Sequence, residues 1–88
     1  MEIPTRYGTI RVTLHAKERW AQRTGLNDWD LIGAVLKTRR PTKNQLRRIM
    51  KREVGWRPKR ILECECAYFL LKNNQIVTVY DKREVHHA

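Results

Sequence analysis

The sequence lacks the patterns that mark several common protein classes. It has no run of about 18 apolar residues, which excludes an ordinary membrane-spanning helix. It has no glycine-rich phosphate loop, nucleophile elbow or carboxylate cluster, so the nucleotide-dependent and hydrolase chemistries of those motifs are unsupported. The start, residues 1–5, lacks the charged and then apolar pattern of a signal peptide. We therefore expect a cytoplasmic protein with no cofactor and no membrane partner.

Cysteine is scarce, and both cysteines lie close together. Cys64 and Cys66 are separated by one residue inside an apolar run, where a strand would hold both side chains on one face. In a cytoplasmic protein such a pair is more typical of reduced core thiols than of a disulfide. Zinc binding together with His86 and His87 is disfavoured, because Cys-x-Cys is not a usual zinc spacing. We expect no metal.

Acidic residues are also few, nine against 19 lysines and arginines, and the formal charge is +10. Eleven basic residues and one acid, Glu53, lie between Lys37 and Arg60, so this segment carries the whole excess. A concentrated positive charge attracts polyanions, and we predict a nucleic-acid partner, with RNA favoured over DNA. The residues expected to bind it are Arg39, Arg40, Lys43, Arg47, Arg48, Lys51, Arg52, Trp56, Arg57, Lys59 and Arg60. Trp56 fits either base stacking or a lid over the core.

The composition, 41% hydrophobic and 32% charged, is that of one small globular domain over residues 1–88. Alternating apolar residues predict a short strand over residues 9–14. A helix is expected from a cap near Thr13 to Gly25, a second from Asn27 to the residues before Pro41, and a third over residues 42–52. The last begins with the capping box Thr42 and Gln45. The segment 37–60 is therefore basic and partly helical.

The C-terminal third is rich in β-forming residues. Residues 61–72, with a bend near 63–66, and residues 76–80 are expected to pair around a hairpin turn at Asn73 and Asn74, which tolerate positive φ. Residues 81–88 form a polar tail, and we expect its end, at His86 and His87, to fray. The predicted fold is α+β, with an N-terminal short strand and two to three helices packed on a small twisted antiparallel sheet that ends in a C-terminal β-hairpin.

Two groups of side chains are expected to build the core and its edges. The helical spacing assigns the following residues to the core: Ala16, Trp20, Trp29, Ile32, Val35 and Leu36. In the last strand, alternation sets Val77 and Val79 on one face and Ile76, Thr78 and Tyr80 on the other. One face would join the core, and the other would present two hydroxyl groups.

His15, Arg19 and Arg23 form the most suggestive pattern in the chain. Their spacing of four places one imidazole and two guanidinium groups in a row on a helix. The same row also fits an ordinary solvated helix face. His15 is the one histidine that we expect inside a structured segment, and an ordinary imidazole suits either proton role near neutral pH.

The row His15-x3-Arg19-x3-Arg23-Thr24-Gly25 after a short strand, together with the terminal strand over residues 76–80, resembles a known group. It is similar to the BrnT and RelE-like toxins, in the barnase, EndoU, colicin and RelE superfamily of metal-independent ribonucleases, which includes many phage and prophage members. The resemblance implies helices before a twisted antiparallel sheet lined with histidine, arginine, threonine and tyrosine. It also implies an antitoxin or a host protein as a partner.

Cleavage of RNA without a metal needs a base for the 2′-hydroxyl proton, an acid for the departing 5′-oxygen, and cations on the phosphate. The candidate catalytic residues are His15, Arg19, Arg23, Thr78 and Tyr80. His15 would move a proton, and Tyr80 would move the second if a nearby arginine lowers its pKa. Arginine forks match two phosphate oxygens, and Thr78 would hydrogen-bond the phosphate.

Two alternatives stay open at this point. The chain could bind a nucleic acid or a nucleoprotein machine through the same basic segment without cleaving it, as a phage-encoded protein that acts on host machinery would. It could instead dock on an acidic protein surface, because basic helices serve that use too.

Overall fold

A computed structural model describes residues 1–53, 58 and 60–86 of the chain. Its element order is β1 (Glu2–Thr5), β2 (Gly8–Val12), α1 (Leu14–Thr24), α2 (Asp28–Leu36), α3 (Lys43–Arg52), β3 (Arg60–Glu63), β4 (Ala67–Lys72), β5 (Gln75–Asp81) and α4 (Lys82–His86). The predicted α+β class is confirmed. Among the described residues, no helix is long and apolar enough to cross a membrane.

The five strands form one sheet in the order β1-β2-β5-β4-β3. Three of the four pairings are antiparallel, but β2 pairs with β5 in parallel, so the sheet is mixed rather than wholly antiparallel. The predicted bend near residues 63–66 is the turn between two separate strands, β3 and β4. Strand β1 and helix α4 were not predicted, since neither short segment has a strong periodic pattern.

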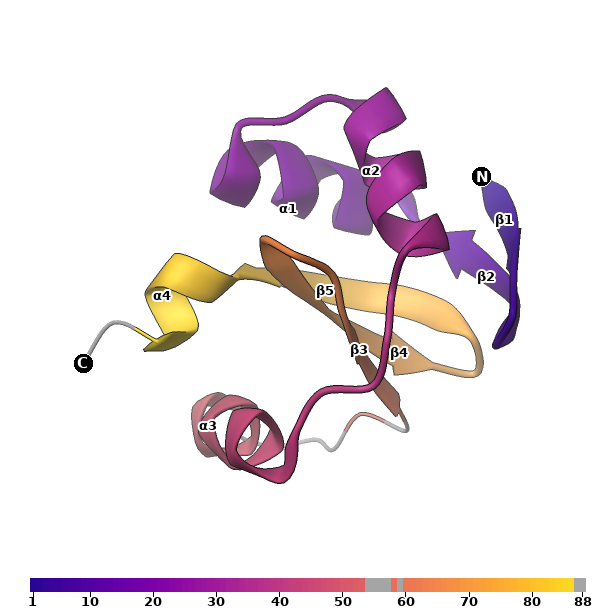
Figure 1. Cartoon of the computed structure of the whole chain (residues 1–88). Coiled ribbons are helices and arrows are strands. Elements are labelled where there is room, and N and C mark those ends of the chain that lie inside the picture. Colours follow the sequence, from indigo (N-terminus) through magenta and orange to yellow (C-terminus); the bar gives the residue numbers. More distant parts are fainter. Residues whose placement is uncertain (54–57, 59, 87–88) are drawn as a thin grey trace.

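Helices cover both faces of this sheet, with α1 and α2 on one side and α3 on the other (Figure 1). Trp20 of α1 and Leu31 and Val35 of α2 pack against Phe69 and Val79 in the larger core. Ile49 of α3 and Val85 of α4 pack with Tyr68, Leu70 and Ile61 in a smaller one. The sheet therefore lies between helices α1 and α2 on one side and the basic helix α3 on the other (Figure 1).

The helix signals in the sequence are confirmed locally. Thr13 caps α1, whose C-cap Gly25 has a φ of 74°. Asn27 caps α2 and Thr42 caps α3, each with a complete capping box. Asn73 and Asn74 have positive φ values of 55° and 56° in the β4–β5 turn, as predicted. Side-chain hydrogen bonds to nearby backbone groups explain why these caps were predictable.

The predicted end of the second helix, just before Pro41, is wrong. Helix α2 ends at Leu36, with Lys37 as its C-cap. Beyond it the chain is extended, because Arg39 forms an antiparallel bridge with Glu63 beside β3.

Two predictions of side-chain burial are wrong. Trp29 and Leu36 are 80% and 54% exposed, whereas Leu31 and Val35 are fully buried. A helix turns about 100° per residue, so Trp29 lies on nearly the opposite side of α2 from Leu31. The predicted burial of Val35 is confirmed, and Ile32 packs against the larger core, so the covered face includes Leu31, Ile32 and Val35 but not Trp29 or Leu36.

A bulge changes the faces of β5. Leu71 and Leu70 of β4 pair with Ile76 and Thr78, so Val77 is an extra residue in β5. Ile76 and Val79 consequently share the larger core. The predicted grouping of Val77 with Val79 is therefore wrong, although Thr78 and Tyr80 do lie on one face.

Candidate functional site

The outer surface of α3 is a cationic face. Its sequence contains five basic residues and no acid, and all five side chains are exposed: Lys43, Arg47, Arg48, Lys51 and Arg52. We call this set the α3 basic face. Lys43, Arg47 and Lys51 form one row with a spacing of four, and none of them has an ion pair with any residue that the structure describes. Their charge is therefore available to a partner.

The inner edge of the α3 basic face lies beside two tyrosines. Tyr68 of β4 and Tyr80 of β5 are paired across the strands, which places their side chains on the same face. Tyr68 is fully buried, while Tyr80 is partly buried beside Ile49 and Val85. The two rings pack against Ile49 of α3 and Val85 of α4.

Tyr80 is bracketed by two guanidinium groups. The Cζ atoms of Arg23 and Arg52 lie 4.7 Å and 5.3 Å from the centroid of its ring. Its hydroxyl donates a hydrogen bond to Glu53. Burial raises the pKa of Tyr80, the hydrogen bond to Glu53 raises it further, and Arg23 opposes the shift only in part. The lowered pKa that a proton-transfer role for Tyr80 requires is therefore not found.

Glu84 joins Arg23 and Arg52 from α4. Its carboxylate oxygens lie 3.5 Å from Arg23 Nη1 and 3.8 Å from Arg52 Nη2. Arg23 also donates to the Val79 carbonyl at 2.9 Å, and Arg52 donates to the Glu84 carbonyl at 3.3 Å. Because these contacts come from three helices and a strand, they fix two cations over one aromatic ring.

His86 of α4 completes the group and corrects a prediction. The sequence predicts a frayed tail, but His86 ends a helix and contacts both Tyr68 and Arg48. Arg48 Nη1 lies 2.6 Å from the imidazole Nδ1. Arginine has only donors, so Nδ1 accepts, and the Nε2 hydrogen of this tautomer points to the Tyr68 hydroxyl. His15 is therefore not the only structured histidine.

We call the group formed by these side chains the arginine–tyrosine cluster; its members are Arg23, Arg48, Arg52, Tyr68, Tyr80 and His86. Sequence patterns gave no direct signal for His86, because a helix of five residues at the end of the chain has little periodicity. The position of Tyr68 in this cluster was not predictable either, since the sequence of a β-strand does not show which of its faces packs against a basic helix.

The predicted catalytic residues divide into separate places. His15 and Arg19 contact each other on the surface of α1, with Arg19 Nε 3.4 Å from the imidazole Nε2. Arg23 instead joins Tyr80. Eight residues of helix separate His15 from Arg23 by about 12 Å along the axis. Thr78 is partly buried, and its hydroxyl forms no hydrogen bond with a described residue.

The other predicted nucleic-acid ligands are also scattered. Arg40 is exposed, and Arg60 donates to the Tyr7 carbonyl and to Asn74 from strand β3. Arg39 is paired with Glu63, with its Nε 2.8 Å from the carboxylate. Three further residues lie outside the described part of the chain: Trp56, Arg57 and Lys59.

Glu63 is a buried carboxylate in a fully bonded site. Lys82 Nζ lies 3.0 Å from its Oε2, and Gln45 donates to the same oxygen at 2.7 Å. Burial by itself would raise the pKa of Glu63, but the hydrogen bonds from Lys82 and Arg39 outweigh burial and lower it. This network holds the start of α3 on the sheet, and it occupies Arg39.

In the part of the chain that the structure describes, no group of three or more histidine, cysteine or acidic side chains is arranged to hold a metal ion. No family model, curated protein or solved structure matches the chain. The function must therefore be inferred from geometry and charge.

Proposed function

We propose that this chain binds RNA through the α3 basic face, and that the arginine–tyrosine cluster beside it holds a backbone phosphate. The observation that carries the proposal is the row Lys43, Arg47 and Lys51, which is exposed and unpaired among the described residues. Ordinary solubility does not require a helix with five cations and no acid. Repeated phosphates are the ligand whose charge and spacing suit such a row.

The electrostatic part of the proposal is tested with two double variants of equal charge. Arg47→Gln/Lys51→Gln removes two cations from the α3 basic face, whereas Arg11→Gln/Lys72→Gln removes two exposed cations from the sheet. Binding of a labelled single-stranded RNA is measured by fluorescence anisotropy at several salt concentrations. The first variant should flatten the slope of log affinity against log salt by about 1.4, because each lost phosphate contact accounts for about 0.7.

The control variant should leave that slope close to the parent value. An equal loss of RNA affinity in the two variants would show that binding depends on total charge, and it would contradict binding through the α3 basic face. Duplex DNA of the same length serves as a competitor, and stronger competition by DNA than by unlabelled RNA would contradict the preference for RNA.

A second candidate function is metal-independent cleavage at a 2′-hydroxyl. The contact of His86 with Arg48 and Tyr68 favours it, because an exposed imidazole then lies beside cations that suit a phosphate. His86 Nδ1 would accept the 2′-hydroxyl proton after Arg48 moves to the phosphate. The 2′-oxygen would then bond to phosphorus as the bond from phosphorus to the 5′-oxygen breaks, and solvent water would protonate the departing 5′-oxygen. The resemblance to BrnT and RelE-like toxins supports the same reaction with His15 as the proton carrier.

The two histidines provide matched tests. Purified parent, His15→Gln and His86→Gln are incubated with RNA in EDTA, and the products are separated on a gel. Loss of cleavage only in His86→Gln would support the arginine–tyrosine cluster, and loss only in His15→Gln would support the row on α1. If the parent leaves RNA intact while still binding it, cleavage is wrong and the binding function remains.

A further inference from the structure

Helix α2 carries an apolar stripe on the side that faces away from the sheet. Trp29 and Leu36 are 80% and 54% exposed, and they lie seven residues apart, so they share one face of the helix. Gly33 lies between them, and an added Cβ there would meet no atom within 4 Å. Large exposed apolar side chains in such a row are typical of an interaction surface.

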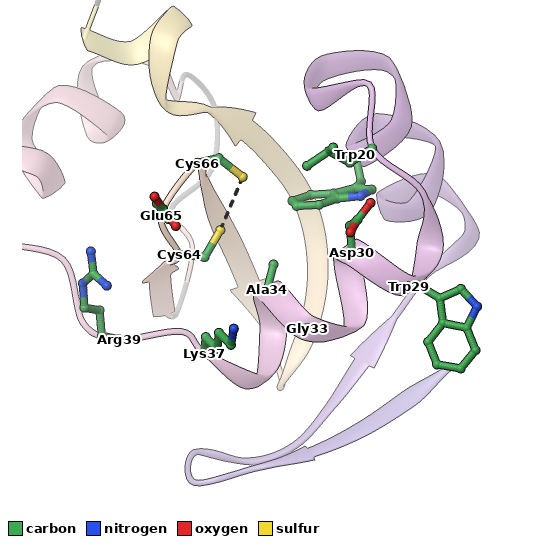
Figure 2. A pocket seen from close by; sticks show the side chains of 11 residues that line it. Trp20, Trp29, Asp30, Gly33, Ala34, Lys37, Arg39, Cys64, Glu65 and Cys66 are labelled. Carbon is green, nitrogen blue, oxygen red and sulfur yellow. Dashed lines mark hydrogen bonds between the residues drawn. The ribbon is translucent and has the colours of Figure 1, made fainter.

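The stripe borders a hollow in the surface. Trp29 and Gly33 line one side of a cavity of about 380 Å³, and Cys64 and Cys66 line its other side. In Figure 2 the indole of Trp29 points away from the two cysteines and outward from α2. Although Trp29 borders the cavity, most of its side chain is exposed and accessible to a partner.

Charge on the same flank indicates what the partner is. Asp30 near the start of α2 and Lys37 at its C-cap are also seven residues apart, and both line the cavity. Lys37 forms no ion pair with a described residue. The helix is thus acidic at its N-terminal end and basic at its C-terminal end, which makes it complementary to a reversed copy of itself.

We propose that a second copy of this chain docks on the stripe, with the two α2 helices antiparallel about a twofold axis near Ile32 and Gly33. The reversal places Trp29 of each copy against Leu36 of the other, and Asp30 against Lys37, so every contact occurs twice, as a twofold interface requires. Gly33 leaves room at the centre for close approach. Antiparallel helix dipoles add to the attraction.

This dimer leaves the RNA-binding surfaces open. The α3 basic face lies on the opposite side of the sheet from α2 (Figure 1), so the two copies would present separate cationic faces. Five of the eleven basic residues between Lys37 and Arg60 belong to the α3 basic face, so much of the positive charge lies away from the α2 helices and repulsion between the two copies is reduced. A nine-residue helix offers only about 13 Å of contact length, so the dimer should be weak.

The test measures the dissociation constant of the dimer by sedimentation equilibrium, without RNA, over micromolar to millimolar chain. Trp29→Ala should weaken the dimer at least tenfold, and Leu36→Ala several-fold. Leu14→Ala is the matched control, because Leu14 is 70% exposed on α1 and lies outside the stripe. Leu14→Ala should leave the dissociation constant of the dimer unchanged.

A charge swap tests the antiparallel arrangement itself. Lys37→Glu and Asp30→Lys should each dimerise poorly alone, because each creates two like-charge contacts. An equimolar mixture should form a heterodimer with affinity near that of the parent, since both pairs regain opposite charges. Circular dichroism of each variant checks that α2 still folds.

Three results would overturn the proposal: a parent that stays monomeric at every concentration, stripe variants no weaker than Leu14→Ala, or no recovery in the mixture. A monomer that still binds RNA would reject the dimer and leave the proposed function standing. A dimer that does not bind RNA would support the α2 interface and reject the proposed RNA binding.

Discussion

The guanidinium of Arg23 lies over the ring of Tyr80, with its Cζ 4.7 Å from the ring centroid, and its Nη1 donates to the Val79 carbonyl at 2.9 Å. One side chain from the end of α1 thereby holds two consecutive residues of β5. The contact joins the helix that carries the predicted catalytic row to the arginine–tyrosine cluster.

Replacing Arg23 should therefore affect stability as well as RNA binding. Arg23→Ala removes a charge-assisted hydrogen bond and a cation–π contact, and we expect a loss of about 1–3 kcal/mol in the free energy of unfolding. Arg23→Lys should recover only part of this, because an ammonium group cannot bond the carbonyl and cover the ring as a planar fork does. Urea unfolding of both variants measures the difference.

Arg19→Ala is the control for this prediction, since Arg19 lies one turn away and its guanidinium bonds to the exposed His15. It should change stability by less than about 0.5 kcal/mol. Equal effects at the two positions would show that the Tyr80 contact contributes nothing.

The same substitution should have opposite signs at two glycines. Gly33 is inside α2 with open space where a Cβ would lie, so Gly33→Ala should stabilise the fold by about 0.5–1 kcal/mol. Gly25 has a φ of 74° at the C-cap of α1, so Gly25→Ala should destabilise it by about 1 kcal/mol. Thermal unfolding at low chain concentration, where dimerisation does not contribute, measures both values.

The Glu63 network should make stability depend on acid. Its carboxyl has a lowered pKa in the folded chain, so the stability it contributes is present above its ordinary pKa and is lost as pH falls through the folded value. Glu63→Gln should cost about 1–3 kcal/mol near neutral pH and flatten the acid limb of the stability curve. Glu65→Gln, at an exposed position two residues away, is the matched comparison and should leave the limb unchanged.

The Cys66 thiol should make the stability of the fold depend on alkaline pH. Burial raises the pKa of the Cys66 thiol from 9.0 to about 11, and the neighbouring Cys64 adds to the shift, with the two sulfur atoms 3.9 Å apart. The folded chain keeps this proton while the unfolded chain loses it, so stability should fall as pH rises from 9.0 to about 11. Cys64→Ala should move the pKa of Cys66 back toward 9.0.

Thiolate absorbance across an alkaline titration follows Cys66, and urea unfolding at each pH follows stability. Alkylation of the folded chain should be slow at neutral pH, because the thiolate is the reactive form. Rapid alkylation there, or a Cys66 pKa near 9.0 in the folded parent, would contradict the prediction.

Local features were predictable where the deciding interaction is local. The side chains of the caps Thr13, Asn27 and Thr42 each accept a hydrogen bond from the backbone three residues on, and the positive φ of Asn73 and Asn74 depends on their own side chains. Burial on α2 was not predictable in the same way. That helix has two apolar faces, and sequence spacing alone does not show which one the sheet covers.

The candidate site shows the same division. The predicted helix from His15 to Arg23 is confirmed. Whether these side chains can contact one phosphate depends on where α1 crosses β5. The sheet brings only Arg23 to Tyr80, and it leaves His15 and Arg19 on the surface. Trp56, Arg57 and Lys59 lie outside the described residues, and their predicted roles stay predictions.

The sequence by itself determined the α+β class, the starts of the first three helices, the turn at Asn73 and the concentration of charge between Lys37 and Arg60. Each follows from neighbouring residues or from counting. Only the tertiary structure decided the parallel pairing of β2 with β5, the bulge at Val77, the exposure of Trp29 and the union of Arg48, Tyr68 and His86. These features join segments far apart in the chain, and packing among several elements selects them.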